Sequence, residues 1–327
     1  MLTATEAVRA WSEVLKSPCR ATFFHTRAWA EILEATFSSW KASPLALRFP
    51  DGNHAVVPLM RRRLLGVGPY YYESMLPGVY GGPLFLRDGT TEQWEAVWSA
   101  LACLRNVVLL GNPYRAWTIA PRLETRAVYT HVLDLSRGFA AVSRGFSKGH
   151  RADISAARRD GVTLREASCE ADVDRYYELY QESLARWGSG AGGFYPKKLF
   201  LAMLHRPEFG SAIKLWTAYY RGSMIGGAWM FSWSDHVVYW HGASNSEGRK
   251  FHAAHAIVSA AMLAACEGGY RWFDFNPSGG LRGVETFKAA FGAQRVEFRY
   301  YRMLDVFGKV QRACRFWKQK YLKRCGL

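Results

Sequence analysis

The sequence predicts an α+β protein that is built from two similar halves. In each half, a helical stretch rich in aromatic residues is followed by a hairpin, a further strand and another helix. The chain has 327 residues, which at roughly 100–200 residues per domain is enough for two domains, each with its own hydrophobic core. A duplicated α+β unit accounts for both observations.

The first half begins with the helical stretch at residues 26–37. Residues 45–49 and 55–60 then read as two strands of a hairpin, because a Pro-Asp-Gly-Asn turn sequence separates two largely apolar runs. A strand at residues 127–135 closes this half. We therefore expect an N-terminal domain at residues 1–142.

The second half repeats this order and contains a well-defined strand at residues 236–244. Regular alternation along that strand would put Tyr239 and His241 on the same face. We expect the C-terminal domain to span residues 143–305. Its other elements are predicted at residues 171–186, 215–219, 224–231, 253–268 and 272–275.

The last segment, residues 306–327, predicts a basic amphipathic helix. It carries seven Lys and Arg residues and no acidic residue, and its apolar residues recur at three- and four-residue spacing. Such a helix suits an interface beside anionic lipid headgroups. The alternative is that the apolar stripe packs on the second domain, and the cations then extend a surface for a polyanion.

Positive charge is concentrated in three stretches. The net charge is +16, and residues 61–63, 143–165 and 306–327 together supply 14 of these charges. This placement indicates an anionic partner.

Composition also limits where the protein works. No apolar run reaches the roughly 18 residues of a membrane-spanning helix, and the charged N-terminus does not resemble a secretory signal. We therefore expect a cytoplasmic protein. The six cysteines form no CxxC pair, which indicates reduced thiols and not a zinc module.

Several enzyme classes are disfavoured by the absence of their motifs. The sequence has no GxxxxGK[ST], GxSxG or HExxH, which argues against P-loop, serine-hydrolase and zinc-hydrolase chemistry. Residues 188–193 fit GxGxxG but follow a helical pattern, so we interpret them as a glycine loop or linker. His252 and His255 lie one helical turn apart without a third ligand nearby, and we interpret them as a helix surface and expect no metal.

Four segments of the chain resemble a known family. They are residues 25–29 (HTRAW), 77–83 (PGVYGGP), 151–162 (RADISAARRDGV) and 270–293 (YRWFDFNPSGG…GVETFKAAFGA). In their amino-acid sequences and in their order along the chain, these segments resemble the Fem-type aminoacyltransferases and their FemAB-like relatives, a branch of the GNAT acyltransferase superfamily. The resemblance implies an α+β fold of two tandem GNAT-like domains, each a central mixed sheet flanked by helices.

The resemblance also implies a reaction, in which an acyl or aminoacyl group passes from an activated ester or thioester to an amine. Fem enzymes take the aminoacyl group from aminoacyl-tRNA and extend a peptidoglycan precursor peptide. We therefore expect tRNA and a small peptide or lipid-linked acceptor as partners, with a possible peripheral contact to anionic membrane, no DNA and no cofactor. Unlike the best-known members, this chain lacks an inserted coiled-coil arm.

Two alternatives remain open. CoA-using relatives hold the pyrophosphate at a helix N-terminus through [QR]xxGx[GA], and the corresponding turn here reads RKFHAA from Arg249, with His252 in place of the glycine. An acyl-CoA-dependent N-acyltransferase that acts on a polysaccharide, lipid or amino-sugar precursor is the first alternative. The second is a non-catalytic GNAT-like protein that binds RNA or anionic membrane through its basic stretches.

Four residues are candidates for catalysis. By resemblance, Lys288 neutralises charge on the leaving ester or donor phosphate, and we expect it at a helix start near the surface, where it could also be a solvated lysine. Asp274 lies between two phenylalanines, and burial would raise the pKa of its carboxyl towards that of a base, although it could simply cap the following turn. Tyr239 and His241 could relay the amine proton or pack in the core.

Two further groups are candidates for binding. Lys148, Arg151 and Arg158 are spaced 3 and 7 residues apart, so they share one face of a helix. This face could bind phosphates, or it could be an ordinary solvated face. The RKFHAA turn, which follows the strand at residues 236–244, and the FK pair at residues 287–288 add further candidates. The expected donor-binding residues are therefore Lys148, Arg151, Arg158, Phe287, Arg249 and Lys250. The expected acceptor-binding residues, which could instead form a tight turn, are Tyr80, Gly81 and Gly82.

Overall fold

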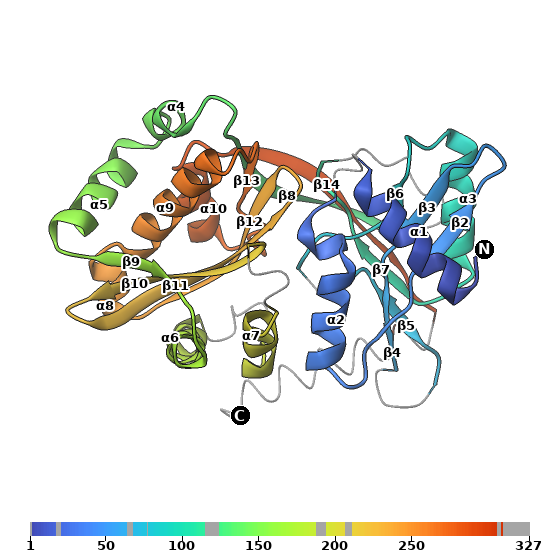
Figure 1. Ribbon diagram of the computed structural model, residues 1–327, viewed down its shortest axis with the longest axis horizontal. Coiled ribbons are helices and arrows are strands. Elements are labelled where there is room, and N and C mark those ends of the chain that lie inside the picture. Colours follow the sequence, from blue (N-terminus) through green and yellow to red (C-terminus); the bar gives the residue numbers. More distant parts are fainter. Residues whose placement is uncertain are drawn as a thin grey trace. The chain divides into compact units, whose positions relative to one another are not determined.

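The computed structural model describes residues 2–17, 21–63, 68–76, 78–114, 124–187, 194–206, 211–305 and 309. The chain forms two compact units, whose elements are labelled in Figure 1. Unit 1 contains Met1–Tyr129 and the segment that starts at Glu297, and unit 2 contains Thr130–Val296. The predicted tail helix at residues 306–327, except Lys309, and the glycine-rich stretch at residues 188–193 lie outside the described residues.

The chain passes between the units within two long strands. β8 (Glu124–Asp134) begins in unit 1 and ends in unit 2, and β14 (Gln294–Met303) leads back to unit 1. The sequence pattern had placed both domain boundaries beyond these strands, after residues 142 and 305.

The helices of unit 1 begin at threonines that cap them. The Thr3 and Thr90 side chains each accept a hydrogen bond from a backbone N–H three residues on, and Glu6 and Gln93 reach back to the cap N–H. Thr26 caps the next helix in the same way, without the reciprocal bond. The helices described in this unit are α1 (Ala4–Lys16), the short 3-10 helix η1 (Phe23–His25), α2 (Arg27–Thr36) and α3 (Thr91–Ala102).

The strands of unit 1 pair in two groups, in the orders β1-β4-β5-β7-β14-β8 and β2-β3-β6. The predicted hairpin is confirmed as far as Val57, since β2 pairs antiparallel with β3 around Gly52, whose φ of +78° suits glycine. Pro58 has no N–H for the ladder, so β3 ends there and β4 joins the other group. The strands are β1 (Lys41–Ala42), β2 (Leu45–Arg48), β3 (His54–Val57), β4 (Met60–Arg62), β5 (Tyr71–Glu73), β6 (Leu84–Phe85) and β7 (Val107–Leu110).

The strands of unit 2 follow the order β8-β13-β12-β11-β10-β9. Neighbouring strands are antiparallel except β12 and β13, which are parallel. The predicted hairpin β10–β11 and the predicted bounds of β12 are confirmed. The strands are β9 (Thr163–Glu166), β10 (Ile213–Tyr220), β11 (Ser223–Trp233), β12 (His236–Ser244) and β13 (Trp272–Asp274).

Helices cover both faces of the sheet in unit 2. Figure 1 shows α9 and α10 on one face and α6 and α7 on the other. Residues of α9 such as Ile257 and Met262 form a buried core with the strands beneath them. The helices are α4 (Phe139–Arg144), α5 (Lys148–Arg159), α6 (Glu170–Trp187), α7 (Lys197–Leu204), α8 (Ser246–Lys250), α9 (Ala253–Glu267) and α10 (Arg282–Ala289).

A β-bulge in β12 overturns one expectation about the faces of this strand. Trp229 of β11 lies opposite His241, but the next residue, Met230, lies opposite Tyr239, so the register shifts by one residue. Tyr239 therefore packs with the core under α9, whereas His241 contacts the aromatic residues of α6. The prediction that Tyr239 and His241 share a face is wrong, because it assumed unbroken alternation.

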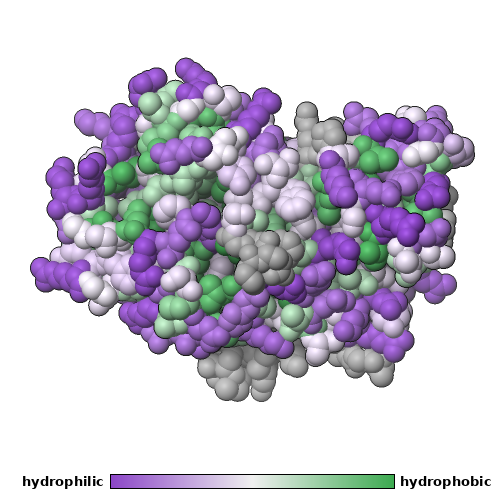
Figure 2. Space-filling model, viewed as in Figure 1, coloured by the Kyte–Doolittle hydropathy of each residue, from purple (hydrophilic) through white to green (hydrophobic). Residues whose placement is uncertain are grey.

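Polar side chains dominate the surface that Figure 2 shows, with scattered apolar patches between them. No helix among the described residues has the length and apolar character needed to cross a membrane.

Candidate active site

The strands β12 and β13 separate at the centre of unit 2. Their parallel pairing ends where Val238 meets Asp274, yet β12 continues to Ser244. Beyond that point no described strand pairs with this edge of β12. The chain instead turns away after β13 through Asn276, whose φ is +58°, and Pro277.

A buried carboxylate organises the turn after β13. The side chain of Asp274 is fully buried, and its Oδ1 accepts hydrogen bonds of 2.7 Å from both the Thr130 hydroxyl and the Asn276 N–H. Asp274 thus caps this turn, as one of the two sequence interpretations holds. Its role as a base stays a prediction.

Lys288 lies beside this carboxylate. It is 3% exposed, and its Nζ donates a hydrogen bond of 2.6 Å to the carbonyl oxygen of Asn276. Burial lowers the pKa of the ammonium to about 8, although the nearby Asp274 and Glu285 carboxylates act in the opposite direction. The expectation of a surface lysine at a helix start is wrong, because Lys288 is near the end of α10 and points inward.

Two further polar groups belong to this cluster. The burial of His131 and the neighbouring Lys288 charge lower the pKa of the imidazole. Ser278 is buried, and its hydroxyl has no hydrogen-bond partner among the described residues. We define the transfer cluster as Thr130, His131, Asp274, Asn276, Ser278 and Lys288.

The face of β12 that packs against α6 carries a neutral imidazole. The Tyr176 hydroxyl lies 2.5 Å from Nδ1 of His241, and burial lowers the pKa of His241 to about 3 while it raises the pKa of Tyr176. Tyr176 is therefore the donor in this bond. The rings of Tyr180 and Tyr195 lie 4.7 and 5.6 Å from that of His241 and complete an aromatic surround.

Tyr239 packs with the core under α9. Its ring centre is 6.2 Å from that of Phe275, and burial raises the pKa of its hydroxyl to about 12, so it is a neutral donor at physiological pH. Gly242 is required beside it, because a Cβ at Gly242 would lie 2.2 Å from the hydroxyl oxygen.

The predicted cationic stripe lies on α5. Lys148, Arg151 and Arg158 are exposed along this helix, as the spacing predicts. Arg151 also donates hydrogen bonds to the carbonyl groups of Arg144 and Phe146, which ties α5 to the end of α4. A role of the stripe in binding phosphate stays a prediction.

The predicted donor turn lies between α8 and α9. The Arg249 side chain donates to the Ser244 carbonyl at 3.3 Å, and Arg186 of α6 donates to the same oxygen at 3.4 Å. Burial and this second guanidinium lower the pKa of Arg186. Lys250 lies over the Phe251 ring at 5.1 Å.

Two other residues bear on the donor-site predictions: His252, which stands in place of the expected glycine, and the predicted donor-binding residue Phe287. His252 adopts a left-handed backbone with φ +56°, which is the conformation that a glycine favours at this turn. Phe287 is partly buried against the core of unit 2, with ring centres 5.2 Å from His150 and Phe291.

The predicted acceptor residues lie in a buried turn of unit 1. Tyr80 is fully buried and packs edge-on against Phe24 and Phe298. A Cβ at Gly81 would lie 2.4 Å from that of Ser74, and Gly82 has φ +95°. These constraints account for both glycines as a tight turn, and a role in acceptor binding stays a prediction.

Comparison with a family model decides the nature of unit 2. Residues 146–289 match the model described as an acetyltransferase (GNAT) domain. Unit 2 has the GNAT fold. The matched range includes β12, β13 and α10, and so most of the transfer cluster of this GNAT domain.

Solved structures support the expected Fem-type branch at the level of fold. FemX has a TM-score of 0.62 with 14% identity, covering 93% of this chain and 97% of its own. The C-terminal domain of a "Putative Lysylphosphatidylglycerol Synthetase" from Agrobacterium fabrum has a TM-score of 0.52 with 14% identity, covering 98% and 97%. A protein of unknown function from Bacteroides thetaiotaomicron VPI-5482 has a TM-score of 0.57 with 10% identity, covering 93% and 98%. No curated protein matches the chain in sequence.

Sequence analysis missed several members of the cluster in the GNAT domain. Thr130 and His131 come from β8, about 140 residues before Asp274, and no local pattern connects them. Asn276 and Ser278 had a usable signal, because they are polar residues directly after a short apolar strand. Arg186 was read only as the end of a helix.

Proposed function

We propose that this protein transfers an aminoacyl group from aminoacyl-tRNA to an amine of a peptide or of a cell-wall or natural-product precursor. The observation that carries the proposal is the buried Lys288 cation, which bonds to Asn276 just after β13 separates from β12. A cation and backbone N–H groups in a water-poor site stabilise negative charge that develops on a substrate carbonyl. Such a site suits acyl transfer from an activated donor, which needs no covalent intermediate.

The chemistry that this geometry supports is direct aminolysis. The amine nitrogen attacks the ester carbonyl, a C–N bond forms, and the C–O bond to the ribose breaks. The amine loses one proton and the leaving ribose oxygen gains one. Lys288, with a pKa of about 8, can supply a proton to the leaving oxygen near neutral pH, and the neutral hydroxyl of Tyr239 is a second donor.

The cations around the end of β12 support an anionic donor. Arg186 and Arg249 converge on the Ser244 carbonyl, so that two like charges are held close together. A phosphate between them would offset their repulsion. The exposed α5 stripe adds further cations, as a polynucleotide with many phosphates requires.

One observation favours the acyl-CoA alternative. The left-handed backbone at His252 leaves the turn before α9 in the conformation that a phosphate-binding glycine would give, although a side chain is present. The acceptor would then be an amine of a polysaccharide, lipid or amino-sugar precursor. We rank this function second, because binding CoA does not require cations both along α5 and at the end of β12.

Binding measurements separate the two donors. We expect the wild-type protein to retain bulk tRNA on filters with a steep salt dependence, and to show no thermal shift with CoA. The Arg186→Gln/Arg249→Gln variant should lower the slope of log K against log[salt] by roughly 0.7–0.9 per lost contact. Lys214→Gln, which changes an exposed lysine paired with Glu166, is the control and should leave the slope unchanged.

Two results would overturn the proposal. A CoA shift without tRNA binding would replace the donor by acyl-CoA. tRNA binding without any amide product, tested by mass spectrometry with a charged-tRNA mixture and candidate amines, would favour a non-catalytic RNA-binding protein.

A further inference from the structure

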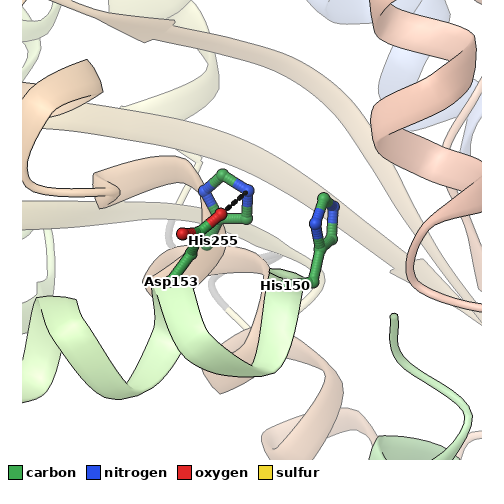
Figure 3. Close-up of side chains that lie close together, drawn as sticks. All are labelled: His150, Asp153 and His255. Atoms are coloured by element: carbon green, nitrogen blue, oxygen red, sulfur yellow. Dashed lines mark ion pairs between the residues drawn. The ribbon is translucent and has the colours of Figure 1, made fainter. Parts of the chain in front are cut away.

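Four titratable side chains meet where α5 packs against the start of α9. His150 and Asp153 come from α5, and His252 and His255 come from the first turn of α9 and its cap. Figure 3 shows the Asp153 carboxylate directed at the His255 ring, with His150 beside it. Asp153 lies 3.4 Å from Nε2 of His255 and 3.5 Å from Nδ1 of His252.

His150 is held in the way that metal-binding histidines are held. Its Nε2 lies 3.0 Å from the Phe287 carbonyl oxygen, so donation of the Nε2 proton leaves a lone pair on Nδ1. The ring packs edge-on against His255 and Phe291, with centres 4.5 Å apart in both cases. The side chain therefore has little freedom to turn away from the cluster.

His255 offers a neutral imidazole. Burial, followed by the neighbouring His150, lowers the pKa of His255 to about 4, so the ring is uncharged at neutral pH and keeps a lone pair. Its Nδ1 is buried and has no hydrogen-bond partner among the described residues. The other ring nitrogen, Nε2, faces the Asp153 carboxylate at 3.4 Å, and a neutral imidazole nitrogen beside a carboxylate is a pair of ligands that suits a cation.

We propose that His150, Asp153 and His255 bind a divalent transition-metal cation such as Zn²⁺. One potential ligand atom from each lies within 4.8 Å of the others. Zn–N and Zn–O bonds of about 2.0–2.2 Å bring ligand atoms closer than this, so the side chains must close by about an ångström. Two imidazoles and one carboxylate are a donor set that zinc accepts, with a fourth position left for water or His252.

This site revises the interpretation of His252 and His255 as a plain helix surface. That interpretation rested on the lack of a third ligand nearby in the sequence, but α5 supplies one from about 100 residues earlier. Ala157 is the buried residue of α5, and Ile154 packs partly buried against the core of unit 2. A bound cation would fix α5, with Lys148, Arg151 and Arg158, against the turn that precedes α9.

Metal binding can be measured without any knowledge of the substrate. Full-length protein stripped with a chelator is titrated with Zn²⁺ against a competing chromophoric chelator, and with Co²⁺ to record visible absorption. We expect one tightly bound equivalent and a Co²⁺ spectrum of tetrahedral type. Asp153→Asn and His255→Gln should each weaken binding by about tenfold or more.

Control variants keep the test decisive. His205→Gln changes an exposed histidine that pairs with Glu170, and it should bind zinc as the wild type does. Thermal unfolding without metal shows whether each variant folds, and Asp153→Asn is the safest because its side chain is 34% exposed. At the same zinc concentration, zinc should raise the Tm of the wild type more than that of Asp153→Asn. Absence of a bound equivalent, or equal affinity in all variants, would overturn the site.

Discussion

Each unit contains a largely buried cation, and the two are held in different ways. In unit 1, Arg62 donates from Nε and Nη2 to Glu73 at 3.1 and 2.7 Å, and its guanidinium lies over the Trp40 and Tyr71 rings at 4.8 and 5.6 Å. In unit 2, Lys288 donates to a single carbonyl oxygen at 2.6 Å. The first cation is paired with a carboxylate and lies over two aromatic faces, whereas the second bonds to a neutral carbonyl group and has the Asp274 and Glu285 carboxylates only nearby.

This difference separates a structural cation from one that can do chemistry. The charge of a guanidinium that is paired with a carboxylate and stacked on aromatic rings is compensated within the fold. The ammonium of Lys288 is not fully compensated, and its pKa of about 8 measures this deficit. Perturbed groups of this kind concentrate at functional sites, which is why we place transfer in unit 2.

The largest expected effect is on transfer. Lys288→Met removes the cation and keeps most of the side-chain volume, and we expect the transfer rate from charged tRNA to fall by about 10²–10³-fold. The assay follows a radiolabelled aminoacyl group into product. Lys214→Met serves as the matched control and should retain full activity; a rate for Lys288→Met within threefold of wild type would remove this lysine from the site.

Arg62 should show the reverse behaviour. Arg62→Met leaves Glu73 buried without its partner, and we expect the free energy of unfolding to fall by about 3 kcal/mol. Transfer per folded molecule, measured well below the Tm, should not change. If urea unfolding finds equal stability, or if transfer falls as far as in Lys288→Met, the contrast between the two cations is wrong.

A pH series tests the Lys288 charge through stability. An unfolded lysine loses its proton near the ordinary pKa of 10.5, but folded Lys288 loses it near 8. Between these values the unfolded state binds more protons, so the free energy of unfolding rises with pH. The wild type should gain roughly 3 kcal/mol relative to Lys288→Met from pH 8 to 10.5. Parallel curves for the two proteins would contradict the assignment.

The smallest effect concerns the carboxylate beside Lys288. Thr130→Val keeps the shape but removes one of the two hydrogen bonds to Oδ1 of Asp274. We expect a loss of about 1–3 kcal/mol in the free energy of unfolding, because a buried carboxylate loses one of its donors and keeps the Asn276 N–H. Thr286→Val, whose hydroxyl bonds to a carbonyl on the exposed side of α10, is the comparison and should change stability less.

Local patterns predicted the elements well where the structure is regular. The hairpins β2–β3 and β10–β11 follow from alternation around turn residues, and β12 has the predicted bounds. Pro58 shortened one predicted strand for a reason that was visible in the sequence.

The site depended on contacts that no local pattern contains. The bulge opposite Trp229 separates Tyr239 from His241, and it arises from pairing with β11 and not from the sequence of β12. The burial of Lys288 depends on Asn276 and Asp274, and the partners of His255 come from α5. Residue types indicated the chemistry, but only the three-dimensional arrangement indicates which groups meet.

The most direct test of the central claim is the pKa of Lys288 itself. In protein labelled with ¹³C-lysine, the Cε resonance of Lys288 can be assigned by its loss in Lys288→Met and followed as the pH is raised. We predict a midpoint near 8, which shows an ammonium that the fold does not fully compensate. A midpoint near 10.5 would show an ordinary solvated or fully paired lysine and would contradict the account.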